Sequence, residues 1–225
     1  MTTEEITQLR HTHYNATVTS LRKVRSDLMV MRVRPDFPRP AHKPGQYSTL
    51  GMGFWEPRIP DVQSEVLAPG DERKLARRAY SISCSVLDDH HELLDIDRTD
   101  WLEFYIVLVR ESGKKLGPAL TPRLFLLREG DRLYLGEKIT GHFTLDPVKP
   151  EDNVVFLATG TGEAPHNYLV WGLLRRGLPS SPAIRISAWT PMLSRQPSNV
   201  NTTTSSQRFR WSMLSNASYK QQAPI

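Results

Sequence analysis

The chain has 225 residues, of which 39% are hydrophobic and 24% charged, so it is long enough for one large or two small globular domains. No apolar run approaches the roughly 20 residues of a membrane span, and the first residues lack the basic and apolar regions of a secretion signal. We therefore expect a cytoplasmic protein. The single cysteine, Cys84, excludes an internal disulfide and a cysteine-based metal cluster.

The net charge of +5 is unevenly distributed along the chain. No Asp or Glu follows Glu163, whereas seven Lys and Arg residues do, and the 22 basic residues before them are matched by 24 acidic ones. The positive excess therefore belongs to the C-terminal tail. We do not interpret it as a nucleic-acid-binding surface, which requires basic residues clustered on a folded face.

The first third of the sequence predicts β-structure with one long loop. Residues 1–13 are polar and predict an extension that covers or frays from the first strand. Hydrophobic alternation over 14–33 predicts two strands joined by residues 23–27, with prolines ending the pairing from Pro35 onward. Pro44 and Gly45 predict a tight turn into a third strand. Residues 53–77 are longer than a hairpin needs, which indicates a functional or a mobile loop.

The nine residues 77–85 place a cation, an aromatic ring and a hydroxyl close together on an extended segment. Because side chains alternate along a strand, Arg78 and Tyr80 share one face. A guanidinium can bind a diphosphate with two hydrogen bonds, a phenol can pack flat against a tricyclic ring, and Ser81 can hydrogen-bond to a ring nitrogen. This combination suits a flavin dinucleotide, although R-x-Y-S alone also fits an ordinary strand with a surface arginine.

The segment after this strand alternates between turns and regular structure. Residues 88–92 contain acidic and histidine side chains, but consecutive residues do not converge easily on one metal ion, so we predict a solvated turn. Residues 102–109 alternate as a strand. Thr121 is a plausible N-cap for a short helix, Pro122 to Leu127. Its start would favour a phosphate; the alternative is a plain connector.

A domain boundary is predicted at residues 147–152, which are rich in proline and charge. The apolar run 154–158 then predicts a parallel strand covered on both faces. Gly160 and Gly162 would let the backbone approach a phosphate, and Pro165 would begin a helix that ends at Gly177. The apolar positions of that helix are Leu169, Val170, Leu173 and Leu174.

R-x-Y-S at 78–81, followed by L-A-T-G-T-G-E-A-P at 157–165, resembles the ferredoxin-NADP reductases. P-G-Q-Y at 44–47, E-F-Y-I-V at 103–107 and a possible closing strand at 141–145 are similar to further parts of that family. The resemblance covers roughly residues 11–177. It implies an antiparallel Greek-key FAD-binding β-barrel over residues 1–148, followed by an incomplete doubly wound α/β nucleotide-binding domain over 149–225.

The same resemblance implies the site residues and the reaction. FAD would be bound by Arg78, Ala79, Tyr80, Ser81, Tyr105, Val107, Ala119, Leu120, Thr121 and Thr161. NADP(H) would be bound by Gly160, Thr161, Gly162, Ala164 and Pro165. Ser81 and Tyr80 would lie nearest the reaction, and no metal is implied. The implied activity is electron transfer between NADPH and a ferredoxin or flavodoxin carrier. The alternatives are an NADH-dependent reductase module for an oxygenase, and a flavin-binding chain without pyridine-nucleotide activity.

The resemblance stops after Gly177. Residues 178–225 contain no Gly, Asp or Glu and ten Ser, and no second strand–helix unit can be assigned there. A divergent, partly disordered tail is one explanation, and a shift of reading frame is the other, which the abrupt change favours. Glu163 is a smaller departure, because the family usually has a neutral residue there and a carboxylate would repel a bound diphosphate.

Overall fold

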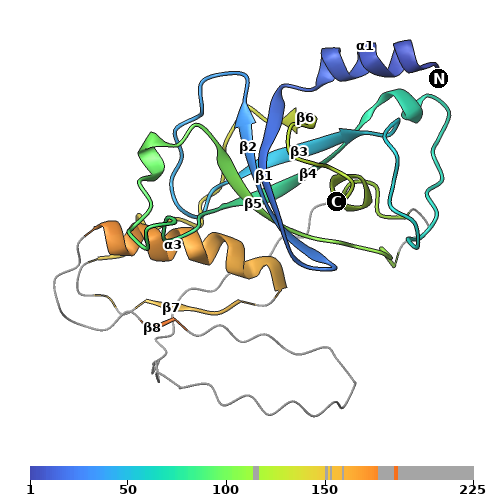
Figure 1. The fold of residues 1–225 in the computed structure, drawn as a ribbon. Helices are drawn as coiled ribbons and strands as arrows, with labels where there is room; N and C mark the ends of the chain where they lie inside the picture. Colours follow the sequence, from blue (N-terminus) through green and yellow to red (C-terminus); the bar gives the residue numbers. More distant parts are fainter. Residues whose placement is uncertain (114–116, 150–151, 153, 159, 177–184, 187–225) are drawn as a thin grey trace.

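The structure, a computed structural model, describes residues 1–113, 117–149, 152, 154–158, 160–176 and 185–186. Six antiparallel strands close a barrel in the order β1-β2-β5-β4-β3-β6 (Figure 1). Because β5 lies between β2 and β4, this is a Greek-key connection, and the predicted barrel is confirmed. The strands are β1 Ala16–Arg25, β2 Leu28–Pro35, β3 Tyr47–Gly53, β4 Leu75–Ser83, β5 Leu102–Val107 and β6 Arg132–Leu135.

The barrel interior is filled by the alternate side chains that the hydrophobic pattern predicts. Met29 and Met31 of β2 and Phe104 and Ile106 of β5 are fully buried. The hairpin between β1 and β2 is tighter than predicted. Arg25 already pairs with Leu28, so the turn is only two residues long, and β2 continues to Pro35.

Residues 3–13 form a helix, α1 Thr3–His13, that packs beside β6, so of the two predicted alternatives, covering or fraying, the fraying is wrong. A capping box starts the helix: the Thr2 amide donates to the Glu5 carboxylate at 2.8 Å, and the Glu5 amide donates to the Thr2 hydroxyl at 3.2 Å. Further along, Arg10 makes two hydrogen bonds to Glu56, of 2.8 and 2.6 Å. The sequence did not predict this helix because α1 has no buried apolar face, and it is linked to the barrel by the charged contact of Arg10 with Glu56.

Glu56 anchors α1 to the loop after β3. Its carboxylate is almost completely buried and also accepts from the Tyr14 hydroxyl at 2.9 Å and the Trp55 indole at 3.0 Å. Burial alone would raise the pKa of this carboxyl, but the bonds from Arg10, Tyr14 and Trp55 outweigh it and lower the pKa from the usual 4.5. The Glu56 charge therefore stabilises the fold above pH 4.5 and ceases to do so as the pH falls through the folded-state pKa.

We expect Glu56→Gln to lower the free energy of unfolding at pH 7 by about 2 kcal/mol, because the four donors on Arg10, Tyr14 and Trp55 then face a neutral amide. The variant should also lose part of the acid-side decline in stability. Urea unfolding at pH 7 and pH 4 measures both effects. Asp146→Asn is the control, since the Asp146–Lys43 pair is exposed and its loss should barely move the urea midpoint. Equal shifts in the two variants would contradict the anchoring role.

The predicted closing strand at 141–145 is wrong. Among the described residues between β6 and β7, one isolated bridge forms, between Tyr47 and Thr140. β6 already closes the barrel by pairing with both β1 and β3. Leu145 is buried instead beside helix α3, Glu163–Arg175.

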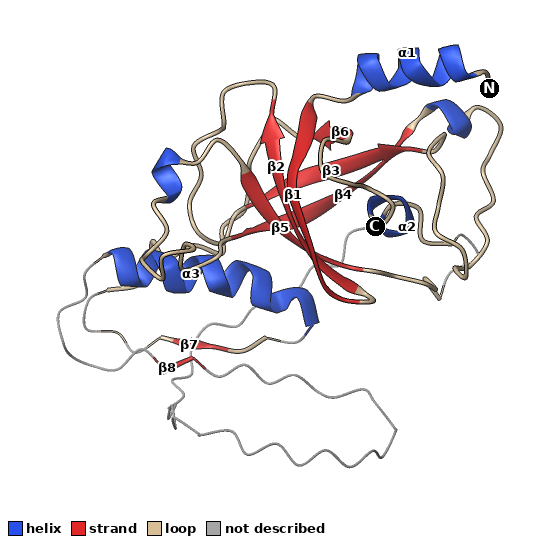
Figure 2. Ribbon diagram, viewed as in Figure 1, coloured by secondary structure: helices blue, strands red, loops and turns tan. Residues whose placement is uncertain are grey.

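Helix α3 packs against β4, and the two-residue strands β7 Val155–Phe156 and β8 Arg185–Ile186 lie on its other side (Figure 2). β7 and β8 are parallel, as predicted for the first of them. The predicted strand over 154–158 is wrong in its length and its coverage, since β7 has only two residues and Leu157 is 62% exposed. The helix starts at Glu163 rather than Pro165, and Leu174 is 48% exposed rather than buried. The Trp171 indole donates to the Leu94 carbonyl at 2.7 Å, which ties α3 to the barrel.

The composition break after Gly177 falls outside the described residues, apart from Arg185 and Ile186. The proposed C-cap, Gly177 itself, lies outside them too. Among the described helices, none has the length and apolar character needed to cross a membrane.

Candidate flavin-binding site

The first seven residues of β4 form an edge. Residues 75–81 pair with β3, whereas β5 pairs only with Ile82 and Ser83. Among the described strands, none pairs with the second side of residues 75–81, so backbone N–H and C=O groups are available there to a ligand. The R-x-Y-S residues therefore lie where β4 and β5 part.

Arg78 and Arg77 are adjacent but have different surroundings. Arg77 lies over the ring of Tyr134 at 5.0 Å, in the space left by Gly51, where a Cβ atom would come within 3.1 Å of both side chains. Arg78 is exposed, and its guanidinium donates to the Arg77 carbonyl at 2.7 Å. No carboxylate in the described part of the chain forms an ion pair with it. Arg78 thus keeps N–H groups that could donate hydrogen bonds to a bound anion.

Tyr80 is half-buried and packs against the barrel core. Burial raises the pKa of its phenol to about 12, and the nearby Arg78 charge only partly opposes this. The phenol is therefore neutral at physiological pH. Ser81 is half-buried and Ala79 exposed, on the opposite face from Arg78 and Tyr80, as strand alternation requires.

Tyr105 and Val107 are the half-buried residues of β5, between fully or nearly fully buried neighbours. Burial raises the pKa of the Tyr105 phenol, and the Glu163 carboxylate raises it further. Glu163 opens α3, and the turn Gly160–Gly162 before it contacts β5. The structure therefore brings one group of predicted flavin residues together with the predicted nucleotide loop.

Ala119 and Leu120 precede the short helix α2, Thr121–Leu124. The N-cap is Leu120, so the prediction of Thr121 as N-cap is wrong, and the helix ends at Leu124 rather than Leu127. The Thr121 hydroxyl instead accepts from the Val109 amide at 3.0 Å, just beyond the end of β5. The Val109 amide lies beyond the last strand pairing of β5 and needs another acceptor, which the Thr121 hydroxyl supplies instead of capping the helix.

The acidic and histidine-rich run 88–92 forms the predicted turn. The Asp88 carboxylate accepts from the amides of His90 and Glu92 at 2.8 and 3.0 Å, and Leu87 and Leu93 form a bridge at its base. The side chain most suited to bind a metal there is therefore used to close the turn.

Sequence reasoning missed two buried charged residues near the site. Glu103 on β5 is 3% exposed, pairs with Arg32 at 3.0 Å and accepts from Ser85 at 2.8 Å. Burial, with a contribution from Glu103, raises the pKa of the Cys84 thiol to about 12, so the thiol stays protonated. Arg123 on α2 is the second missed residue. No sequence signal identifies either, because their partners are set by strand register and loop packing.

A closed barrel of six antiparallel strands is the fold of ferredoxin-NADP reductase-like FAD-binding domains. Comparison with known proteins confirms the predicted resemblance. The chain is 38% identical over 88 residues to a ferredoxin-NADP reductase of Pseudomonas aeruginosa, a match covering 39% of this chain and 28% of that protein. It is 36% identical over 95 residues to a flavodoxin/ferredoxin-NADP reductase of Rhodobacter capsulatus, covering 42% and 29%.

These matches span less than a third of each curated relative. Among solved structures, the fold matches the CS-b5R domains of human Ncb5or with a TM-score of 0.58 and 18% identity, over 79% of this chain and 44% of that one. It also matches the flavohem-like FAD/NAD-binding domain of a Vibrio cholerae nitric oxide dioxygenase, with a TM-score of 0.52 and 15% identity, over 79% and 62%. At these identities the likeness shows the fold alone. No family model matches the chain.

Proposed function

We propose that this chain is a flavin-dependent oxidoreductase of the ferredoxin-NADP reductase type, and that it binds FAD along the open edge of β4. The observation that carries the proposal is Arg78. Its guanidinium is exposed, pairs with no carboxylate among the described residues, and shares a strand face with the half-buried ring of Tyr80. A diphosphate and a planar ring, joined as in FAD, match these two groups.

The residues around β4 fit the cofactor. Arg78 would bind the diphosphate, Tyr80 would cover one face of the flavin ring, and Ser81 would donate to a ring nitrogen from the adjacent position. Tyr105 and Val107 would line the site from β5, with Thr161 nearby. The Thr121 hydroxyl accepts from the Val109 amide and keeps its own O–H donor, so segment 119–121 would act through that donor and its backbone amides.

When bound, FAD supplies the ability to accept a hydride and release its electrons singly. The chain's own residues would orient the ring and keep water from it. The neutral phenol of Tyr80 suits that task, because an ionised phenolate would bring water with it. Ser81, half-buried, would be the hydroxyl nearest the reacting edge.

NADPH would bind at Gly160, Thr161, Gly162, Ala164 and Pro165, and a ferredoxin or flavodoxin would be the partner carrier. No side chain caps the start of α3, so the amide groups of its first turn are open to a phosphate. Glu163 in that turn would oppose an anion. On this proposal residues 1–148 form the FAD domain and 149–225 the nucleotide domain.

We expect the purified protein to carry FAD rather than FMN, because segment 119–121 gives the cofactor a second anchor beyond Arg78. Chromatography of the cofactor released by denaturation identifies it. Recovery of FMN, or of no flavin after reconstitution with excess FAD, would count against the proposal.

A further inference from the structure

Arg123 is a buried arginine whose hydrogen-bonding capacity is fully used within the chain. Its side chain is 2% exposed, and each of its five N–H groups has an acceptor. The two oxygens of Glu65 accept at 3.1 and 2.7 Å. The other acceptors are the carbonyls of Glu56 at 3.1 Å, Phe54 at 2.9 Å and Ala119 at 2.5 Å. No donor is left for a ligand, in contrast to Arg78.

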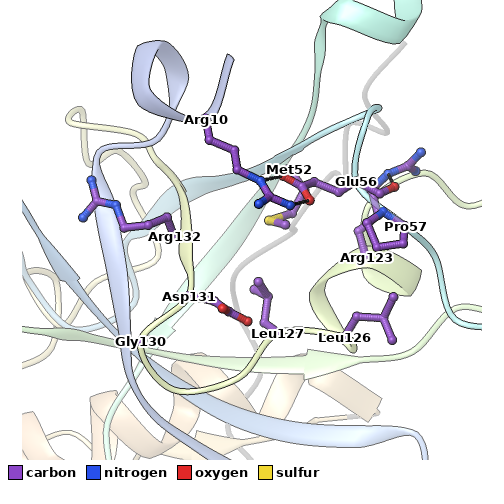
Figure 3. Close-up of a pocket in the computed structure, with 10 residues that line it drawn as sticks. All are labelled: Arg10, Met52, Glu56, Pro57, Arg123, Leu126, Leu127, Gly130, Asp131 and Arg132. Atoms are coloured by element: carbon purple, nitrogen blue, oxygen red, sulfur yellow. Dashed lines mark hydrogen bonds and ion pairs between the residues drawn. The ribbon is translucent and has the colours of Figure 1, made fainter. Parts of the chain in front are cut away.

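These bonds join the long loop after β3 to the segment that leads into α2. Phe54, Glu56 and Glu65 belong to the loop, whereas Ala119 belongs to the segment. Arg58 adds a bond of the same kind, from its guanidinium to the Pro118 carbonyl at 3.0 Å. Figure 3 shows Arg123 beside Glu56, whose carboxylate accepts hydrogen bonds from Arg10 of α1.

The fit between loop and segment is close at Gly117. A Cβ atom there would lie 2.6 Å from the backbone oxygens of Gln63 and Ser64. Segment 117–121 is therefore held by hydrogen bonds from Arg58 and Arg123 and by direct backbone packing at Gly117. The bond between the Val109 amide and the Thr121 hydroxyl fixes its other end. The long loop after β3 therefore packs directly against this segment and is bonded to it through Arg58 and Arg123.

We propose that Arg123 and Glu65 are positioning residues that hold segment 119–121 in the conformation that binds the diphosphate and adenosine half of FAD; this rests on the function proposed above. Backbone amides bind phosphate well only when their directions are fixed before binding. Arg123 fixes them through the Ala119 carbonyl, and Glu65 fixes Arg123. Neither side chain touches the cofactor.

The test compares FAD with FMN, which lacks the adenosine half. Dissociation constants of both flavins are measured by equilibrium dialysis for cofactor-free wild type, Glu65→Gln and Arg123→Lys. Each variant loses a charged hydrogen bond that orients Arg123 and segment 119–121, so FAD binding should weaken roughly tenfold. FMN binding should change by less than about twofold, because Arg78 and Tyr80 are untouched.

Arg132→Gln is the matched control. Arg132 lines the same pocket as Arg123 and pairs with Asp36, but it makes no hydrogen bond to segment 117–121. Arg132→Gln should leave the ratio of the FAD and FMN dissociation constants as it is in wild type. Equal weakening of FAD and FMN, an unchanged ratio, or unfolding of both test variants at the assay temperature would overturn the positioning role. Wild type that binds neither flavin would instead overturn the proposed function.

Discussion

Replacing Arg78 with alanine is expected to weaken FAD binding by roughly 2 to 4 kcal/mol, about 30- to 1000-fold, because a bidentate charged contact is lost and a phosphate is left unpaired. The side chain is exposed and forms no ion pair within the described chain, so the fold itself should be unaffected. The measurement is the FAD dissociation constant, with the melting temperature of the cofactor-free protein recorded alongside.

Two further variants make the Arg78 experiment specific. Arg78→Lys keeps the charge but loses the planar fork, so it should recover only part of the affinity. Arg77→Ala removes the same charge one residue away, from the face that packs on Tyr134. It should change FAD affinity by less than about threefold. Similar losses for Arg77→Ala and Arg78→Ala would mean that net charge matters, rather than the geometry of β4.

The second large effect concerns NADPH. We expect the FAD-loaded chain to be reduced slowly by NADPH, because the described part of the proposed nucleotide domain consists of α3, the glycine turn and two strands of two residues each. Such short strands bury little surface. Residues 178–225 are rich in Ser, Thr, Asn and Gln, a composition that opposes core formation. On the proposed function, the Glu163 carboxylate would repel the phosphates of a nucleotide bound at the glycine turn.

Stopped-flow mixing of the FAD-loaded protein with NADPH, followed at the flavin absorbance, measures this rate. Bleaching at about 10 s⁻¹ or faster, a rate typical of enzyme turnover, would refute the expectation. It would show that residues beyond Gly177 complete the nucleotide site. Glu163→Gln is a useful companion variant, and it should bind NADP⁺ somewhat more tightly than wild type.

Strands β2 and β5 could be predicted because large apolar residues recur at every second position, as in the buried pairs Met29 and Met31, and Phe104 and Ile106. The R-x-Y-S segment was assigned to the correct strand, with Arg78 and Tyr80 on one face, since alternation alone decides that. The glycine turn and α3 were also placed correctly to within two residues. These features are local, so residue order determines them.

The errors came from partners distant in sequence. Helix α1 carries a capping box, but its docking depends on Glu56, 46 residues beyond Arg10. The strand predicted at 141–145 is not needed to close the barrel, because β6 already joins β1 to β3. The Thr121 hydroxyl accepts from the Val109 amide because β5 ends just before Val109. The hydrogen bonds that hold Arg123 depend on Glu65, 58 residues away. Such contacts follow from the closed barrel and cannot be derived from spacing.

The most direct test of the central claim is equilibrium dialysis of the cofactor-free protein against FAD, with bound flavin counted by absorbance. The account predicts saturation at one FAD per chain, and loss of that saturation over the same concentration range in Arg78→Ala. Absence of saturable FAD binding by folded wild type, or identical binding by folded wild type and Arg78→Ala, would contradict a flavin site on β4.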